Sequence, residues 1–170
     1  AESGKKILLA GVNYLKTYLN SASGLNSHYI KTIHHEFTHI LNQTRDYPAG
    51  FREVTGTTYV ADSWSSPPYN SGYLKRGYIS SYAQHSAGED FAEILSLYVT
   101  NDEAWWNKQL VSASADGSEG GELLKTKLDF VRSYMKDSFN IDIDILRAAV
   151  LRRQGELVAG KVDLTDLSLN

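Results

Sequence analysis

Hydrophobic residues recur with helical spacing in two long stretches of the chain, and each stretch leaves one polar face free. The first stretch covers about residues 30–44, and an apolar stripe follows one side of it. The members of this stripe are Ile30, Ile33, Phe37, Ile40 and Leu41. In the second stretch, Glu89–Val99, the apolar side consists of Phe91, Ile94, Leu95 and Tyr98. Both patterns predict amphipathic helices that pack on a core and turn a polar face away from it.

Capping signals mark where further helices begin. Ser86 and Glu89 have the spacing of a capping box and open the second stretch. Thr100 and Glu103 repeat this spacing, and Asp142 or Asp144 is placed to cap a last helix. The helices that follow carry Trp105 and Trp106, the apolar residues from Leu123 to Tyr134, and those from Ile145 to Leu157. The C-terminal part is therefore expected to be mostly helical.

The connections are rich in turn-forming residues. Residues 20–26 are predicted to form a loop, with Asn26 or Ser27 capping the helix that follows. A long irregular segment is expected from Arg45 to Ser80, because it holds all three prolines and many aromatic residues. Its aromatic side chains can line a substrate groove or pin the loop to the surface.

Two short segments have the composition of strands. The apolar run Ile7–Ala10 can be a buried strand or the start of a helix, and we favour a strand. Val54–Val60 is rich in β-branched residues and supplies a second candidate. The pattern therefore predicts an α+β fold, in which a small N-terminal sheet accompanies the first helix and helices make up most of the remainder.

Length and composition narrow the class of protein. A chain of 170 residues with 42% hydrophobic content suits one domain, which we expect to span residues 1–170. A net charge of −3 gives no basic surface for nucleic acid, and no stretch has the length of a membrane span. The sequence has no cysteine, so a bound zinc ion needs histidine and carboxylate ligands.

The first helix carries the pattern His-Glu-x-x-His at His35, Glu36 and His39. Residues four apart lie on one face of a helix, so both imidazoles can point at one metal ion. His34 points about 100° away from His35 and has no histidine four residues later, so it is not expected to be a ligand. The spacing predicts a zinc site with Glu36 beside it.

A catalytic zinc has three protein ligands and one open position, so one ligand is missing from this motif. Five later side chains are candidates, namely Asp46, His85, Glu89, Asp90 and Glu93. Glu89 and Glu93 stand out because they share the free face of the second helix. If Glu89 binds zinc, Glu93 lies one turn away and can accept the second ring N–H of a zinc histidine.

The sequence also resembles a known family. His35-Glu36-Phe37-Thr38-His39, then Tyr82, then Glu89-Asp90-Phe91-Ala92-Glu93 resemble gluzincin-type metallopeptidases, in particular the zinc-binding metallopeptidase lipoproteins of Bacteroidetes. A more distant likeness is to the catalytic domain of anthrax lethal factor, in which a Tyr also lies seven residues before the zinc-binding Glu. Asp90 departs from that pattern and is expected to add a carboxylate near the site.

The resemblance implies a zincin-like catalytic domain with defined roles for its residues. His35, His39 and Glu89 are expected to hold Zn²⁺, with Glu93 behind them. Glu36 is expected to be the general base and Tyr82 a hydrogen-bond donor to the oxyanion, although Tyr82 can also be a packing residue.

These assignments predict a zinc-dependent metallopeptidase that hydrolyses peptide bonds in a peptide or protein substrate. One alternative is a zinc-stabilised peptide- or glycan-binding module of a nutrient-import complex that has no catalytic activity. In that case His85 or Asp46 is expected as a fourth protein ligand. A further alternative is hydrolysis of a non-peptide amide.

Location and partners follow from the resemblance alone. It implies an extracytoplasmic protein that is lipid-anchored in the cell envelope and associates with outer-membrane nutrient-import proteins. The chain is then expected to be the C-terminal part of a longer lipoprotein, with the signal and anchor upstream of Ala1.

Overall fold

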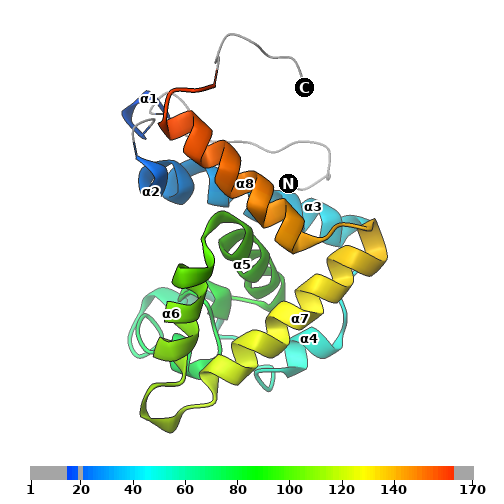
Figure 1. The fold of residues 1–170 in the computed structure, drawn as a ribbon. Coiled ribbons are helices and arrows are strands. Elements are labelled where there is room, and N and C mark those ends of the chain that lie inside the picture. Colours follow the sequence, from blue (N-terminus) through cyan, green and yellow to red (C-terminus); the bar gives the residue numbers. More distant parts are fainter. Residues whose placement is uncertain (1–14, 19–20, 163–170) are drawn as a thin grey trace.

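The computed structural model describes residues 15–18 and 21–162, and the regular segments of this part are helices (Figure 1). The longer ones are α3 (Lys31–Thr44), α5 (Ala87–Thr100), α6 (Glu103–Ala113), α7 (Gly120–Phe139) and α8 (Ile143–Val158). The shorter ones are α1 (Leu15–Tyr18), α2 (Ala22–Leu25), η2 (Asn26–Ile30), α4 (Gly50–Glu53), η3 (Ala61–Ser65), η4 (Leu74–Arg76), η5 (Tyr82–Gln84) and η6 (Ala115–Gly117). Helix α5 lies between α3 and α7 (Figure 1).

The expected α+β fold with an N-terminal sheet is wrong, because the described residues contain no strand. The segment Val54–Val60 forms turns after α4, although its composition favours a strand. Gly56 and Thr57 both have a φ of 61°, in the left-handed region that a strand cannot contain. The N–H of Val60 donates instead to the carbonyl oxygen of Gln84, at 2.8 Å. The other predicted strand, Ile7–Ala10, lies outside the described residues.

The helical run that leads into α3 begins earlier than the sequence suggests. The hydroxyl of Ser21 accepts the N–H of Gly24 at 3.0 Å, and helical structure continues from there through η2 into α3. The loop predicted at 20–26 is therefore wrong over residues 22–26, which are helical, and the predicted caps Asn26 and Ser27 are wrong too. Residue 20 lies outside the described residues. Asn26 lies within the helical run, and its side-chain amide donates to the carbonyl oxygen of Thr100 at 2.8 Å. This bond ties the start of the helical run to the end of α5.

The other predicted caps have mixed outcomes. Ser86 caps α5 as expected, and Asp142 caps α8. The capping box at Thr100 is wrong, because Thr100 still belongs to α5 and its hydroxyl donates to the carbonyl oxygen of Ser96 at 2.6 Å. Asp102 caps α6 instead, by accepting the N–H of Trp105 at 2.8 Å.

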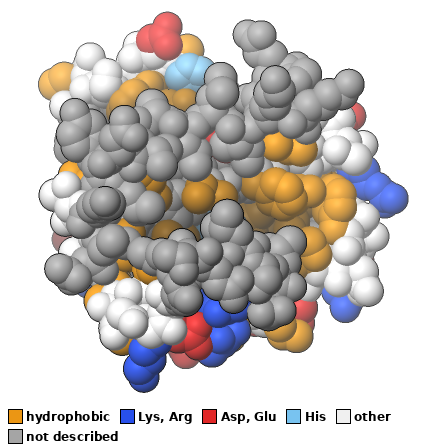
Figure 2. Space-filling model, turned by 90° about the horizontal axis from the view of Figure 1, so that it is seen from above, with side chains coloured by type: hydrophobic (Ala, Val, Ile, Leu, Met, Phe, Trp, Pro, Cys, Tyr) orange, Lys and Arg blue, Asp and Glu red, His pale blue; other side chains and the backbone are white. Residues whose placement is uncertain are grey.

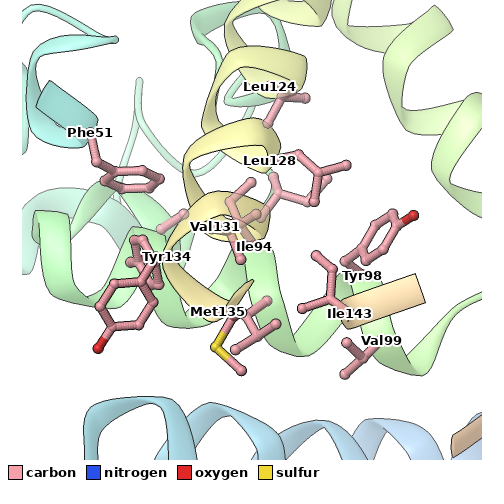
Figure 3. Packing of buried hydrophobic residues seen from close by; sticks show 14 of the residues in the cluster. Phe51, Ile94, Tyr98, Val99, Leu124, Leu128, Val131, Tyr134, Met135 and Ile143 are labelled. Atoms are coloured by element: carbon pink, nitrogen blue, oxygen red, sulfur yellow. The ribbon is translucent and has the colours of Figure 1, made fainter. Parts of the chain in front are cut away.

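Helix α5 is the centre of the hydrophobic core, and most of its residues are buried. Side chains from α5 and α7 meet in one cluster, which Phe51 of α4 and Ile143 of α8 complete (Figure 3). The large side chains of this cluster include Phe91, Ile94, Tyr98, Val99, Leu124, Val131, Tyr134 and Met135. Each such side chain stabilises the fold by about 1.5–3 kcal/mol when it leaves water. Hydrophobic packing thus holds α5 in position without any contribution from a metal ion.

The apolar stripe of α3 is only partly buried. Leu41 is buried as expected, but Ile33 and Phe37 have exposed fractions of 39% and 44%. The expectation that this whole side packs on a core is therefore wrong for these two residues. Hydrophobic side chains also gather at the surface of the molecule when it is viewed from above (Figure 2). Among the described helices, none has both the length and the apolar character that crossing a bilayer requires.

The long segment between α3 and α5 is irregular, as predicted, and contains three short helical turns that follow α4. Arg76 holds it in place, because its guanidinium donates to the side-chain oxygen of Gln84 at 2.8 Å and to the carbonyl oxygen of Ser71, also at 2.8 Å. The side-chain amide of buried Gln84 donates in turn to the carbonyl oxygen of Tyr69. This network fixes η5, the turn that carries Tyr82.

A fully buried ion pair joins α5 to α7. The ammonium of Lys127 lies 2.6 Å from the carboxylate of Asp90, and neither side chain is accessible to solvent. Lys127 also donates to the carbonyl oxygen of Gly77, and the ring of Tyr78 lies 4.1 Å away. Burial raises the pKa of Asp90 to about 6, although Lys127 and a hydrogen bond from Tyr59 oppose this shift. Asp90 therefore points into the core and is not the extra site carboxylate that the sequence suggested.

The substitution Lys127→Met tests the cost of breaking this pair. We expect the free energy of unfolding to fall by about 3–5 kcal/mol, because Asp90 then remains buried without its countercharge. Adding Asp90→Asn is expected to recover most of the loss. Urea denaturation measures both variants, and Lys125→Met, which removes an exposed partner of Glu122, is the matched control. An equal loss in Lys127→Met and Lys125→Met would contradict this role of the pair.

Candidate metal centre

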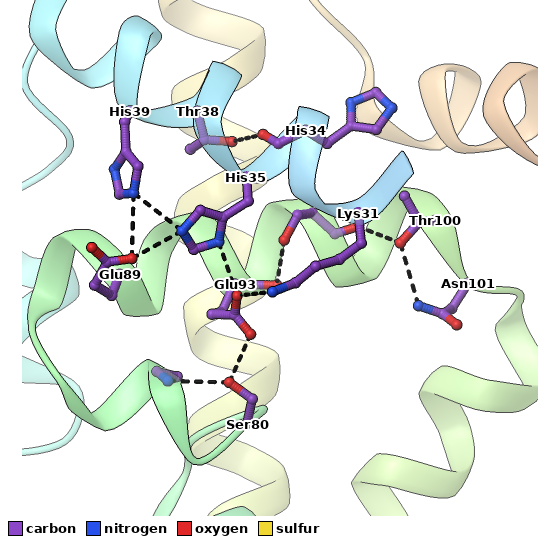
Figure 4. Close-up of polar contacts among 12 residues, drawn as sticks. Lys31, His34, His35, Thr38, His39, Ser80, Glu89, Glu93, Thr100 and Asn101 are labelled. Atoms are coloured by element: carbon purple, nitrogen blue, oxygen red, sulfur yellow. Dashed lines mark hydrogen bonds and ion pairs between the residues drawn. The ribbon is translucent and has the colours of Figure 1, made fainter. Parts of the chain in front are cut away.

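Helices α3 and α5 pack side by side in opposite directions, and their facing sides carry the predicted metal ligands (Figure 4). The contacts show the direction, because Lys31 meets Glu93 whereas His39, two turns later, meets Glu89. His35 lies between them and contacts both glutamates. The hydroxyl of Ser86 accepts the N–H of Glu89 at 3.3 Å, so the cap of α5 helps to fix the position of this residue.

Three possible ligand atoms converge at one point between these helices. Nε2 of His35 lies 2.9 Å from Oε2 of Glu89, and Nε2 of His39 lies 3.3 Å from the same oxygen. The two Nε2 atoms are 3.2 Å apart. A tetrahedral zinc ion with bonds of about 2.0–2.1 Å separates its ligand atoms by roughly 3.3 Å. The donor set and its spacing therefore fit zinc, and these three residues form the metal-capable group found in the described part of the chain.

The electrostatics of this group favour a cation. Burial alone lowers the pKa of His35, but hydrogen bonds to Glu89 and Glu93 outweigh it and raise this pKa to about 9. Burial opposes ionisation of Glu89, but hydrogen bonds from both histidines hold its pKa far below the usual range. Without a metal, a proton on His35 thus partly offsets the negative charge of the two carboxylates. A metal cation can take the place of that proton.

Glu93 lies behind His35, as the sequence predicted for a second-layer carboxylate. Its Oε1 atom lies 2.9 Å from Nδ1 of His35, and the side chain is only 2% exposed. A carboxylate at Nδ1 keeps the proton on that nitrogen, which leaves the lone pair of Nε2 for a metal. Glu93 is therefore placed to favour this tautomer of the His35 ring.

Sequence reasoning missed two residues that hold Glu93. Lys31 forms an ion pair with Oε1, and the hydroxyl of Ser80 donates to Oε2 at 2.7 Å (Figure 4). Ser80 also accepts the N–H of Ala83 at 3.1 Å, which links this network to η5. The position of Lys31, one helical turn before His35, was a signal that could have identified it. Ser80 has no such signal in the sequence.

Tyr82 lies beside the cluster, with its ring centroid 6.0 Å from that of His35. The ring of Trp64 packs edge-to-face with that of Tyr82, with 5.0 Å between the ring centroids. Burial and the negative charge of Glu89 raise the pKa of Tyr82 to about 12, and Glu36 adds to this shift. The hydroxyl of Tyr82 is therefore a protonated donor at neutral pH. Glu36 follows His35 on α3 and is partly exposed.

The other candidate ligands lie elsewhere. Nε2 of His85 is 3.5 Å from Asp62, and its ring packs against Tyr82. Asp46 is exposed in the irregular segment that follows α3. His34 lines a separate cavity with residues of α8, and burial lowers its pKa. Among the described residues, neither His85 nor Asp46 joins the group of His35, His39 and Glu89.

Comparisons with known proteins agree with the chemistry of this group. Residues 1–144 match a family described as "Putative zinc-binding metallo-peptidase". A crystal structure described as a putative zinc-binding metallo-peptidase from Bacteroides caccae is similar, with a TM-score of 0.79 and 31% sequence identity. The similarity covers 88% of this chain and 55% of that one, so the chain spans about half the length of the solved relative. No curated protein matches the chain.

Metal analysis of purified variants tests the ligand set. We expect about one equivalent of zinc per wild-type chain and a sharp loss in Glu89→Ala, because two imidazoles alone bind zinc less tightly. Asp46→Ala and His85→Ala are the matched controls and are expected to keep the zinc of the wild type. Full zinc occupancy in Glu89→Ala would remove this residue from the site.

A second variant tests the role of Glu93. We expect Glu93→Gln to bind zinc about 10–100-fold more weakly, since an amide is a poorer acceptor for the ring N–H of His35. Competition with a chromogenic chelator measures the dissociation constant. Unchanged affinity would show that the orientation of His35 does not depend on this carboxylate.

Proposed function

The chain belongs to the family of zinc-binding metallo-peptidases described above, and on this premise we propose that it is a gluzincin-type zinc peptidase whose own site is catalytic. In this proposal His35, His39 and Glu89 hold the zinc ion. The observation that carries it is the convergence of these three ligand atoms within 4.8 Å of one another, from two helices that are far apart in the sequence.

The chemistry of peptide hydrolysis assigns a task to each residue at the site. Zinc, when bound, makes water more acidic and polarises the carbonyl group of a peptide. Glu36 follows His35 directly on α3, so its carboxylate is placed to accept the proton of the attacking water. The same carboxylate then passes this proton to the leaving amine. Tyr82 is a protonated donor beside the cluster, and it stabilises the negative charge that develops on the carbonyl oxygen.

The position of the other candidate ligands supports catalysis over a purely structural metal. A structural zinc site is closed by four protein ligands, whereas a catalytic site keeps one position open. Within the described residues, His85 and Asp46 do not join the three converging side chains. This favours a peptidase over the zinc-stabilised binding module. Cell-envelope location, lipid anchoring and association with import proteins stay predictions from the resemblance.

The substitution Glu36→Gln tests the proposed general base. We expect zinc content to stay at the level of the wild type, while kcat for a peptide substrate falls by about 10²–10⁴-fold, because the amide cannot accept the proton. A fluorogenic peptide library provides the assay, and metal analysis of the same sample is the control. Activity that survives in a zinc-loaded Glu36→Gln sample would exclude Glu36 as the base.

The substitution Tyr82→Phe tests the proposed oxyanion donor. We expect kcat to fall by about 10²–10³-fold with little change in KM, because the lost hydrogen bond forms in the transition state. Tyr59→Phe is a suitable control, because it removes a hydroxyl that donates to Asp90 in the core. If Tyr82 only packs, Tyr82→Phe is expected to leave kcat unchanged, because phenylalanine keeps the ring that makes these contacts.

A further inference from the structure

A second cavity lies behind the metal site, on the far side of Glu93 from the converging ligand atoms. Its volume is about 650 Å³, which is within the range of small-molecule sites. Residues of α2, η2, α5, α6 and α8 contribute to its walls. Lys31, Ser80 and Glu93, the network that holds His35, line it as well. Figure 4 shows this side of the site, where Lys31 lies between Glu93 and the end of α5.

The cavity carries a positive group and a negative group on different helices. Lys31 supplies an ammonium whose side chain is 24% exposed, and its partner Glu93 is already shared with His35. Asp102 supplies a carboxylate at the start of α6, where it accepts the N–H of Trp105. The ion pairs among the described residues do not include Asp102, so its charge is available to a ligand.

The remaining polar groups of the cavity are side-chain amides and hydroxyls, among them those of Ser23 and Ser27. The side-chain amides of Asn26, Asn101 and Gln154 each donate to a backbone carbonyl oxygen, at 2.8–2.9 Å. The amide of Asn26 also donates to the side-chain oxygen of Asn101 at 3.3 Å, so these side chains are held in place around the cavity. Leu97, Trp105 and Leu151 add apolar surface to the same cavity. A ligand that fits brings polar groups that both donate and accept hydrogen bonds, apolar side chains and one charge of each sign.

We propose that this cavity binds a short peptide with free termini. The carboxylate of the peptide meets Lys31, and its ammonium meets Asp102 beside the ring of Trp105. Its peptide group meets the amides and hydroxyls of the wall, and its side chains cover Leu97 and Leu151. A peptide with both termini blocked lacks both charges and binds poorly.

The position of Lys31 also connects the cavity to the metal centre. A peptide carboxylate competes with Glu93 for the ammonium of Lys31, and Glu93 orients His35. Occupancy of the cavity therefore changes zinc affinity, and zinc changes peptide affinity by the same factor. This coupling rests on the proposed function, whereas the binding site itself does not. Short peptides are the products of a peptidase, so the cavity is suited to product-dependent control.

Indole NMR signals of the full chain report on the binding directly. The chain has three tryptophans, and they lie in different places. Trp105 lines the cavity, Trp64 packs on Tyr82 beside the metal site, and Trp106 is buried. We expect the dipeptide Leu-Leu, added to zinc-free protein, to shift the signal of Trp105 in a saturable way and to leave that of Trp64 in place.

A matched pair of variants and blocked ligands tests the assigned contacts. Asp102→Asn keeps a good helix cap but removes the charge, and we expect it to weaken Leu-Leu binding about tenfold. Glu103→Gln removes the neighbouring charge, which lies outside this cavity, and is expected to bind like the wild type. N-acetyl-Leu-Leu is expected to bind wild type and Asp102→Asn equally, because the ammonium is already absent.

The proposal is overturned if Leu-Leu shifts Trp64 and not Trp105, or if Asp102→Asn and Glu103→Gln bind it equally well. An absence of any shift at millimolar dipeptide overturns it too. Because these measurements use zinc-free protein, they do not depend on whether the chain is a peptidase. The coupling is tested separately by the zinc dissociation constant, which is expected to change with Leu-Leu in the wild type and to change less in Asp102→Asn.

Discussion

The antiparallel packing of α3 on α5 is the constraint on which the candidate site depends. Four residues advance a helix by about 6 Å, so residues four apart on one helix can meet residues four apart on the other. Lys31, His35 and His39 form one such row, and Glu93 and Glu89 form the opposing row. A shift of one turn between the helices would exchange the partners, and His35 and His39 would no longer share Glu89. Three features depend on this register: the convergence of the three possible ligands, the contact of Glu93 with His35, and the cavity that Glu93 lines.

The hydrophobic core maintains this register although the polar groups gathered between α3 and α5 are unfavourable for folding. Removing imidazoles and carboxylates from water costs free energy, unless a cation or hydrogen bonds replace the lost contacts with water. The apolar side of α5 packs on α7, and the buried pair of Asp90 and Lys127 fixes the rotation of α5. Because Asp90 follows Glu89 directly, this rotation also directs Glu89 toward α3. The stability of the core thus keeps the polar face of α5 in place.

The sequence predicted those features that depend on local periodicity. Two histidines four apart on a helix must share a face, and Glu89 and Glu93 follow the same rule on α5. Ser80 and the cavity depend on contacts between distant segments, which spacing cannot reveal. The strand expected at Val54–Val60 failed because β-branched composition says nothing about the left-handed backbone at Gly56 and Thr57. Thr100 had the spacing of a cap, but α5 extends through it.

An anomalous difference map at the zinc edge, from crystals of the zinc-loaded chain, tests this account most directly. The account predicts one strong peak about 2.0–2.2 Å from Nε2 of His35, Nε2 of His39 and a carboxylate oxygen of Glu89. It also predicts that Glu93 stays at Nδ1 of His35. A peak at any other group of residues, or a Glu89 side chain turned away from both imidazoles, would contradict it.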